Sequence, residues 1–423
     1  MENETLSLKK VISWQQGAAM TIGAVLGSGI LILPVAAAEI SGPASLISWA
    51  LMGLLAIPLT TVLGILGSRY PDAGGIAAYT RRAFGETVGA ATATLFLGTV
   101  PIGGPVAALI GANYLGSLFA LSDQAIYVIA ACMLVLAIFF NYWGIQLSGK
   151  VQVGVIILIA VILLVVVIAA LPQVEMTNYI PFAPNGWLAV GSAMTMLFWA
   201  FVGWEMIVHL SEEFKNPAKD IPRSLAAALG VVNLLYFGVA FVTIGTGAYL
   251  GANNGAALAT MIGNGWGKWA GVITGIIGFL VCYGTIHTYV AGFSRLIYSQ
   301  ARSGVFPEYF SHLNATYKTP DRVLLALGLV FFIVIAFSYS NSYNIAFLMQ
   351  LPSSIFIALY ILAMAAAVKL FFDNKLLRYC ALVSLITCTI IYAFTSWVGL
   401  YPIILGGVGL CLKYFKKQTI SKK

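Results

Sequence analysis

Residues 21–34, TIGAVLGSGILILP, decide the fold of this chain. They lie in its first long apolar run, and Gly27, Ser28 and Gly29 interrupt that run near its middle, where a simple membrane helix would carry Leu, Ile or Ala. Each unsatisfied backbone N–H or C=O costs several kcal/mol in hydrocarbon, so an unwound segment persists only where protein or a water-filled cavity covers it. The Gly-Ser-Gly interruption therefore predicts a ligand site at membrane depth.

The composition is that of an integral membrane protein. Of 423 residues, 60% are hydrophobic and 9% are charged, whereas roughly a quarter are charged in soluble domains. Apolar runs of about twenty residues recur along the chain, and no cleavage site follows the first run, so the first span is expected to be retained. We predict an all-α polytopic membrane protein with twelve transmembrane helices, at residues 12–38, 44–68, 87–119, 125–144, 151–171, 187–210, 224–250, 268–299, 323–340, 343–371, 377–395 and 397–413.

The distribution of the net charge of +8 supports this number of spans. With twelve spans, every Lys and Arg except Lys268 falls on the side that carries the even-numbered connections and both termini. An excess of Lys and Arg marks the cytoplasmic side, so we expect a cell-membrane protein with cytoplasmic N- and C-termini, whose positive charge meets the lipid bilayer and not a nucleic acid. The expected organisation is a cytoplasmic N-terminus at 1–11, a ten-helix transport core at 12–371, two additional helices at 372–413 and a basic tail at 414–423.

The sixth span carries a second interruption, FWAFVGWE at residues 198–205. An acid at the bilayer centre costs at least ~2.5 kcal/mol, so Glu205 is expected to face protein or water. The two interruptions are five spans apart, which predicts a five-plus-five inverted repeat with a substrate held between broken helices 1 and 6. Half-helix ends offer free N–H groups to a carboxylate and free C=O groups to an amine, which suits a zwitterion. Taken alone, Gly23 and Gly27 also fit a G-x-x-x-G packing motif, and Gly203 is a weaker signal still.

The third span is irregular, because Pro101, Gly103, Gly104 and Pro105 lie inside it. A kink or a local widening of the helix is expected there. Two interpretations stay open at this point: the irregular segment lines a cavity, or it is a packing kink against a neighbouring helix.

Short motifs follow one another through spans 1 to 10: GSGI at 27–30, YP at 70–71, GG at 74–75, FVGWE at 201–205, KNP at 215–217, IP at 221–222, ARSGVFP at 301–307 and TP at 319–320. In this order they resemble the amino acid–polyamine–organocation transporter superfamily, whose fold is a leucine-transporter-like five-plus-five inverted repeat. Two longer segments look like the bacterial L-methionine and branched-chain amino acid exporter group, namely TVPIGGP at 99–105 and HLSEEFKNPAKDIPRSL at 209–225.

The resemblance implies roles for the matched residues. In the family the Gly-Ser-Gly segment holds the α-carboxylate of the substrate, carbonyl groups near the two breaks hold the α-amine, and an aromatic residue before the span 6 glutamate acts as a lid in some relatives. On this chain the implied carboxylate site is Gly27, Ser28 and Gly29, and the implied amine site is the set of carbonyls near Val25, Trp199, Ala200 and Val202. The implied lid is Trp199, and Glu205 matches the family glutamate that bridges to span 1. Gly203, at the second break, and Tyr289, which is expected to face the pocket, are further candidates for substrate binding.

Three groups of residues are candidates for ion coupling. Glu205 and His209, four residues apart on one helix face, are candidates for carrying a proton, with a structural carboxylate beside a histidine as the alternative. His287, deep in span 8, is a second proton candidate. Thr285 and Thr288 can offer sodium ligands or bond their own helix backbone. Some proton-coupled relatives carry a lysine in the middle of span 5, which this chain lacks, so a lysine-based proton switch is not expected.

The stretches expected to face the pocket are apolar or small, with Trp199, Phe201, Val202 and Tyr289 as the largest side chains. They offer no free acid to a cationic side chain and no buried Arg to an acidic one, so the expected substrate is a neutral apolar amino acid. One methylene changes affinity by only ~1 to 3 kcal/mol, so methionine, leucine, isoleucine and valine are all expected to pass.

We therefore expect a secondary active transporter that works by alternating access, with proton-coupled efflux as the first hypothesis and with no cofactor or metal. An importer, or an exchanger of basic amino acids or polyamines, is the alternative. An intramembrane enzyme with Ser28 as nucleophile is a distant alternative, because no G-x-S-G or H-E-x-x-H motif accompanies that serine. The preferred amino acid, the direction of transport, the coupling ion and the oligomeric state stay open at this stage.

Overall fold

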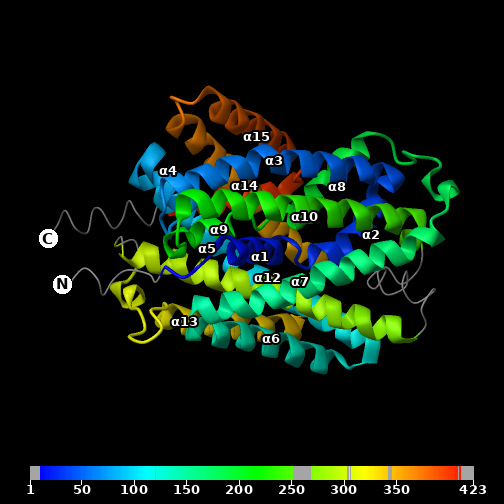
Figure 1. Ribbon diagram of the computed structural model, residues 1–423, viewed down its shortest axis with the longest axis horizontal. Coiled ribbons are helices and arrows are strands. Elements are labelled where there is room, and N and C mark those ends of the chain that lie inside the picture. The colour runs from blue at the N-terminus through cyan, green and yellow to red at the C-terminus, as the bar shows by residue number, and fades with distance from the viewer. Residues whose placement is uncertain are drawn as a thin grey trace.

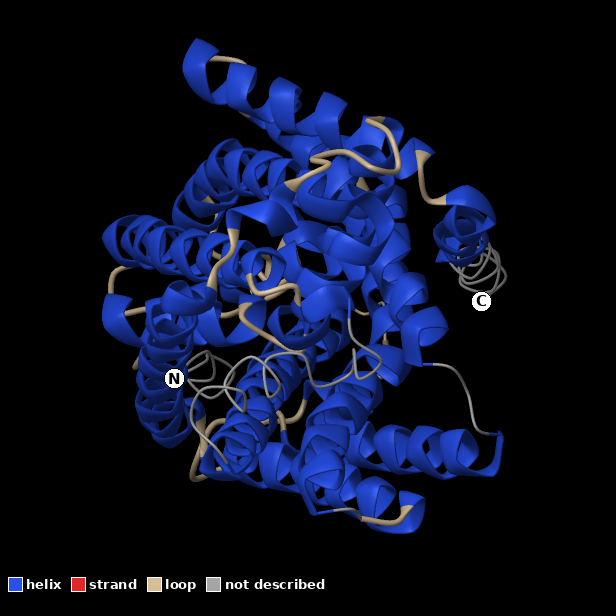
Figure 2. Cartoon of the chain, turned by 90° about the vertical axis from the view of Figure 1, so that its right-hand side faces the viewer, coloured by secondary structure: helices blue, strands red, loops and turns tan. Residues whose placement is uncertain are grey.

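The computed structural model describes residues 10–119, 121–250, 268–302, 304, 306–341, 345–407 and 409–410. Within these residues the named elements are all helices, joined by short loops (Figure 2). Ten helical segments are long and apolar enough to cross a membrane. The expectation of an all-α polytopic membrane protein is confirmed at this level. Most of the expected N-terminus at 1–11 and the whole tail at 414–423 lie outside the described residues.

The first predicted interruption is confirmed, and it explains why ten long segments are found where twelve spans were predicted. The first span consists of two short helices, α1 (Trp14–Val25) and α2 (Gly29–Ser41). Helix α2 continues through a short turn into α3 (Ser45–Arg69), so the two count as one long segment. The last apolar helix, Ser396–Gly407, is too short to be counted.

The second interruption is also confirmed. Helix α8 (Leu188–Leu197) tightens into the 3-10 turn η5 (Phe198–Phe201), and α9 (Met206–His209) begins only after an extended Val202 and a Gly203 with φ +124°. A side chain at Gly203 would be strained by that φ, and its Cβ would lie 2.9 Å from the backbone carbonyl carbon of Ala24. Only glycine lets the two broken helices approach so closely.

Most of the long helices run along the long axis of the molecule (Figure 1). Long apolar helices are expected where every backbone group must be satisfied within its own segment. Their bounds are α4 (Ile76–Phe84), α5 (Glu86–Phe119), α6 (Asp123–Trp143), α7 (Ile145–Ala170), α10 (Pro217–Gly245), α12 (Lys268–Arg302), α13 (Asp321–Asn341), α14 (Ile345–Leu370) and α15 (Lys375–Ala393), with 3-10 turns η2 (Gly42–Ala44), η3 (Leu171–Gln173), η4 (Met176–Tyr179), η6 (Ser211–Glu213), η7 (Ala248–Leu250), η9 (Glu308–Ser311) and η10 (Ser396–Gly399).

One end of the bundle, at the left of Figure 1, carries α4, α9 and the final turns of α3 and α12, and we call it the basic end. A buried ion pair closes it, with Nε of Arg295 2.7 Å from Oε1 of Glu213. The backbone N–H groups of Val11 and Ile12 both donate to the carbonyl oxygen of Glu213 at 2.9 Å. The residues that lead into α1 are thereby tied to the segment that follows α9.

Helix α5 runs without a break through the irregular TVPIGGP segment, with Pro101 and Pro105 inside it. Thr99, Gly103 and Ala107 follow one another at a spacing of four residues and so form one stripe along the helix. All three line the cavity described next. The interpretation that this segment lines a cavity is confirmed.

Candidate functional site

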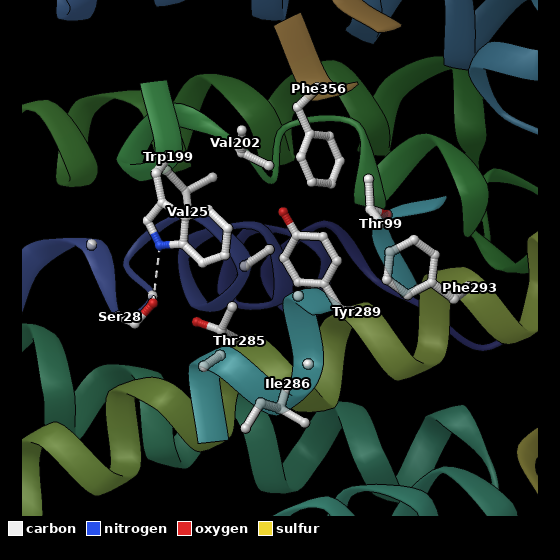
Figure 3. Close-up of a pocket in the computed structure, with 16 residues that line it drawn as sticks. Val25, Ser28, Thr99, Trp199, Val202, Thr285, Ile286, Tyr289, Phe293 and Phe356 are labelled. Carbon is white, nitrogen blue, oxygen red and sulfur yellow. Dashed lines mark hydrogen bonds between the residues drawn. The ribbon is translucent and has the colours of Figure 1, made fainter. Parts of the chain in front are cut away.

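An apolar cavity of about 40 Å³ lies between the two helix breaks (Figure 3). Space of this size admits a few water molecules, so a larger ligand requires its walls to move. Of the residues expected to bind substrate, seven line it: Val25, Gly27, Ser28, Gly29, Trp199, Val202 and Tyr289. The rest of the lining comes from α1, α5, α12 and α14: Ala24, Thr99, Gly103, Gly104, Ala107, Thr285, Ile286, Phe293 and Phe356.

Gly27 lies at the closest approach of the first break to α12. A Cβ at this position would lie 2.5 Å from the hydroxyl oxygen of Thr285, inside van der Waals contact. The same hydroxyl donates to the carbonyl oxygen of Gly23 at 2.8 Å. The glycine and the threonine together hold the unwound segment against α12.

Trp199 separates this cavity from a larger one. Its indole N–H donates to the hydroxyl oxygen of Ser28 at 3.1 Å, which joins the two broken helices across the cavity (Figure 3). Trp199 also lines a second cavity of about 440 Å³, which lies between α2, α8 and α14 and has Glu39 and Gln350 on its wall. The indole therefore lies between the two spaces, where a lid would be.

Ala200 and Gly203 lie behind the cavity wall, where the two breaks touch. A Cβ at Gly29 would lie 2.9 Å from Cα of Ala200. The hydroxyl of Tyr236, on α10, lies within hydrogen-bonding distance of the carbonyl oxygens of both Val25 and Ala200 and donates to one at a time. Two of the carbonyls expected to hold an amine are thus shared with a tyrosine.

No pattern in the sequence pointed to Tyr236. It is a single tyrosine in a long apolar helix, and it reaches Val25 across 211 positions of the chain. Only the packing of α10 against α1 brings the two together. A carbonyl oxygen has two lone pairs, so each carbonyl keeps one acceptor site beside the tyrosine.

Glu205 is fully buried and accepts three hydrogen bonds. The donors are the backbone N–H of Gly203 at 2.9 Å, the hydroxyl of Tyr289 at 3.4 Å and the hydroxyl of Tyr360 on α14. Three donors compensate a carboxylate for much of the water that burial removes. Because Tyr289 lines the cavity, the carboxylate is one side chain away from a bound ligand.

The other coupling candidates have separate partners. His209 directs Nδ1 to the carbonyl oxygen of Ala73, 3.1 Å away, and its ring lies edge-on to Phe96. His287 faces α6, where the amide nitrogen of Asn141 is 3.3 Å from Nδ1. Both histidines are buried, and neither is among the residues that line the cavity.

The hydroxyls of Thr285 and Thr288 join α12 to α1. Each lies within hydrogen-bonding distance of a carbonyl of its own helix, at 3.2 Å in both cases. Each also reaches a carbonyl of α1, Gly23 at 2.8 Å from Thr285 and Met20 at 3.3 Å from Thr288. Both hydroxyls thus bond their own helix backbone, as one of the two interpretations from the sequence expects, and they also bond the backbone of α1.

Comparison with known proteins gives a consistent result. A family model described as "Amino acid permease" matches residues 12–413. The chain is 42% identical over 412 residues to the "Uncharacterized amino acid permease YecA" of Bacillus subtilis, an alignment that covers 97% of this chain and 96% of the relative.

Two further relatives carry more specific names. The "L-methionine/branched-chain amino acid exporter YjeH" of Escherichia coli is 31% identical over 417 residues, covering 97% of this chain and 98% of the relative. The "Branched-chain amino acid permease BcaP" of Bacillus subtilis is 28% identical over 341 residues, covering 74% of this chain and 72% of the relative. With two broken helices around an apolar cavity and a family match along almost its whole length, this chain belongs to the amino acid permease family of membrane transporters.

Proposed function

We propose that this permease exports neutral apolar amino acids, namely methionine, leucine, isoleucine and valine, across the cell membrane by alternating access through a ten-helix core, with two additional C-terminal spans. The observation that carries the proposal is the lining of the cavity between the breaks. Among the described residues that line it, none is charged. A cationic or acidic side chain would lose its water there without gaining a counter-charge, which is costly. The names of the exporter and of the branched-chain permease among the relatives support the same substrate class.

The backbone at the breaks suits the two charged groups that all these substrates share. Helix α2 begins at Gly29, on the cavity wall, and the first turn of a helix carries the positive end of its dipole. The N–H groups of Ile30 and Leu31 donate to the carbonyl oxygens of Gly27 and Ser28 over 3.3 Å, a long distance for a hydrogen bond. The α-carboxylate is proposed to bind there, beside the hydroxyl of Ser28. The α-amine is proposed to bind the remaining acceptor sites on the carbonyls at Val25 and Val202.

The substrate side chain is proposed to extend toward α5. The stripe of Thr99, Gly103 and Ala107 faces the cavity, with Phe293 and Phe356 on neighbouring walls (Figure 3). Apart from its own helix, no heavy atom lies within 4 Å of the Cβ position of Gly103. This open space next to a glycine gives a branched or thioether side chain room that an alanine would fill.

Alternating access is proposed to require two barriers that open in turn. Toward the basic end, the path is blocked by the Glu213–Arg295 ion pair and its surroundings. Toward the other end, Trp199 lines both this cavity and the 440 Å³ cavity beyond it and is proposed to form the barrier between them. If both termini are cytoplasmic, as proposed, the basic end faces the cytoplasm. The cavity is then closed on both sides of the membrane, and the thinner barrier faces the extracellular side.

Proton coupling is proposed to act through Glu205. Protonation of this carboxylate would change its hydrogen bonds to Tyr289 and Tyr360, one of which lines the cavity. Replacement of Glu205 by Gln fixes the neutral form. Exchange of labelled substrate between equal concentrations should persist in this variant, while accumulation driven by a pH gradient should be lost; pH-driven accumulation that equals that of the wild type would refute this role.

The substrate class is tested by counterflow. Proteoliposomes that contain the purified protein are loaded with leucine or methionine and diluted into labelled substrate, and entry of the label is followed with and without a pH gradient, and with and without sodium. Saturable, transient accumulation is expected for all four amino acids. If no neutral amino acid exchanges while arginine or a polyamine does, the proposed substrate class is wrong.

A further inference from the structure

Three cation–π pairs at the basic end form a closed ring that joins α3, α4 and α14. The guanidinium of Arg69, at the end of α3, lies 5.3 Å from the ring centre of Phe371. The ammonium of Lys369, two residues earlier, lies 5.5 Å from the ring of Phe84 on α4. The guanidinium of Arg82, also on α4, lies 4.2 Å from the ring of Tyr70, the residue that follows Arg69. Each of the three segments thus contributes one cation and one aromatic ring, and the ring is covered by a cation from another segment.

A fourth pair extends the ring toward α15. The guanidinium of Arg378 lies 5.0 Å from the ring of Phe372, and Lys375 precedes it by one helical turn. The Nε atom of Arg378 is buried and has no hydrogen-bond partner among the described residues. The described residues therefore offer this guanidinium an aromatic ring but no carboxylate.

These five cations, which we call the basic patch (Arg69, Arg82, Lys369, Lys375 and Arg378), lack acidic partners. In the described part of the chain none of them has a carboxylate within ion-pair distance. Three acids lie close by in sequence or in space. Glu86 pairs with Arg81 at 3.4 Å, Asp72 accepts from the backbone of Gly74 at 2.7 Å, and Asp373 is the remaining single negative charge. Among the described residues, the positive charges of the basic patch therefore outnumber the acids nearby.

An apolar stripe continues from the basic patch along α15. Phe372 and Leu376 are 75% and 72% exposed, beside the cations. Farther along the helix, Tyr379, Ile386 and Ile390 are more than half exposed and lie at helical spacings of seven and four residues, on one face. This surface is cationic at the end of the helix and apolar along it. It therefore complements an anionic phospholipid, whose charged headgroup and apolar acyl chains would lie against the matching parts.

We propose that the basic patch and the stripe on α15 form a binding site for an anionic phospholipid, with the headgroup phosphate on the guanidinium groups and the acyl chains along the stripe. Guanidinium groups bind phosphate through parallel hydrogen bonds, and Arg69, Arg82 and Arg378 each carry such a group. Basic pockets between membrane helices at the cytoplasmic surface are suited to lipid headgroups. A free phosphate ion would use the cations but leave the apolar stripe bare, so the continuity of the two surfaces favours a lipid.

The proposed lipid site would join two pairs of helices that lie far apart in the sequence. Helices α3 and α4 belong to the first half of the chain, and α14 and α15 to the second. A headgroup bound to all four would hold α15 against the ends of α3 and α14. Anionic lipid is therefore expected to raise the thermal stability of the permease as well as to bind it.

Native mass spectrometry of the full-length protein tests the proposal. The protein in detergent is titrated with phosphatidylglycerol or with phosphatidylcholine of identical acyl chains, and bound lipid is counted at each concentration. Retention of phosphatidylglycerol is expected to exceed that of phosphatidylcholine by at least tenfold. The Arg69→Gln, Lys369→Gln and Arg378→Gln variants are each expected to weaken it about fivefold, the factor that ~1 kcal/mol per charge represents.

The matched control is Arg322→Gln. Arg322 also lies over an aromatic ring, that of Tyr309 at 4.6 Å, but outside the patch. Its replacement is expected to leave lipid retention unchanged. An excess of inorganic phosphate is expected to displace little lipid, and effective displacement would mean a free-anion site.

Thermal unfolding in the same lipids separates binding from damage to the fold. A variant that unfolds at the wild-type temperature without lipid but no longer gains stability from phosphatidylglycerol supports the site. Equal retention of both lipids by the wild type, or equal retention of phosphatidylglycerol by the wild type and the three patch variants, would overturn it.

Discussion

Replacement of Gly103 by Ala offers the sharpest test of how the cavity selects its substrate. Gly103 lies at the centre of the α5 stripe that faces the cavity, and the space at its Cβ position is open apart from its own helix. An added methyl group would therefore occupy the space proposed for the end of the substrate side chain. The neighbouring Gly104 differs, because its Cβ would lie 3.1 Å from the ring of Phe331 on α13.

The expected magnitude follows from the size of the change. A substrate one methylene too large for its pocket loses ~1 to 3 kcal/mol, or about 10- to 200-fold in kcat/KM. Leucine and methionine should fall by such a factor in the Gly103→Ala variant, whereas valine, whose side chain is one carbon shorter than that of leucine, should fall less. The fold should be retained, because alanine is favoured over glycine within a helix by about 1 kcal/mol.

The assay is competition of unlabelled amino acids with labelled substrate in proteoliposomes, reported as the ratio of kcat/KM for leucine to that for valine. Gly230→Ala is the matched control, because Gly230 lies on α10 with open space at its Cβ position and away from the cavity. Gly104→Ala is the second control, and it should lower stability or rate without changing the ratio. An unchanged ratio in Gly103→Ala, or an equal loss for all substrates, would refute the proposed position of the side chain.

Three further outcomes are expected. Gly27→Ala should abolish counterflow while the protein still inserts and folds, because its Cβ would lie 2.5 Å from a hydroxyl oxygen of α12; wild-type flux would remove the site from the first break. Trp199→Phe loses the hydrogen bond to Ser28 and, at about 1 kcal/mol per bond, should weaken substrate retention severalfold, measured as a faster off-rate; an unchanged off-rate would argue against a lid. Glu213→Gln should lower the free energy of unfolding by ~3 to 5 kcal/mol because it leaves Arg295 buried and unpaired, and the double variant with Arg295→Met should recover part of this loss in denaturant unfolding; no loss in the single variant would contradict a closed, dry barrier at the basic end.

The positions of the two breaks could be predicted from the sequence because their causes are local. Gly27, Ser28 and Gly29 are poor helix formers in an apolar run, and Glu205 is an acid that lipid would not tolerate. Backbone hydrogen bonding and the cost of charge in hydrocarbon apply to each segment by itself. The irregular third span stayed open to two interpretations. Its prolines and glycines are visible in the sequence, but whether they face a cavity depends on the helices that pack beside them.

The partners of the candidate residues could not be predicted in this way. Glu205 and His209 are four residues apart, but they have different partners. The carboxylate accepts hydrogen bonds from tyrosines on α12 and α14, whereas the histidine contacts the turn between α3 and α4. Residues four apart on one turn can each find a different partner, because the partners come from other helices whose packing the spacing does not specify.

The sequence by itself determined that this chain is a membrane protein with unwound segments in its first and sixth spans, because hydropathy and backbone hydrogen bonding are properties of contiguous residues. Only the tertiary structure decided what surrounds those segments: Tyr236 on two of the break carbonyls, Trp199 on Ser28, and the stripe through Gly103 on the opposite wall. These contacts join residues that are as many as 211 positions apart. They depend on how the helices pack against one another, and side chains at such separations leave no periodic signal in the chain.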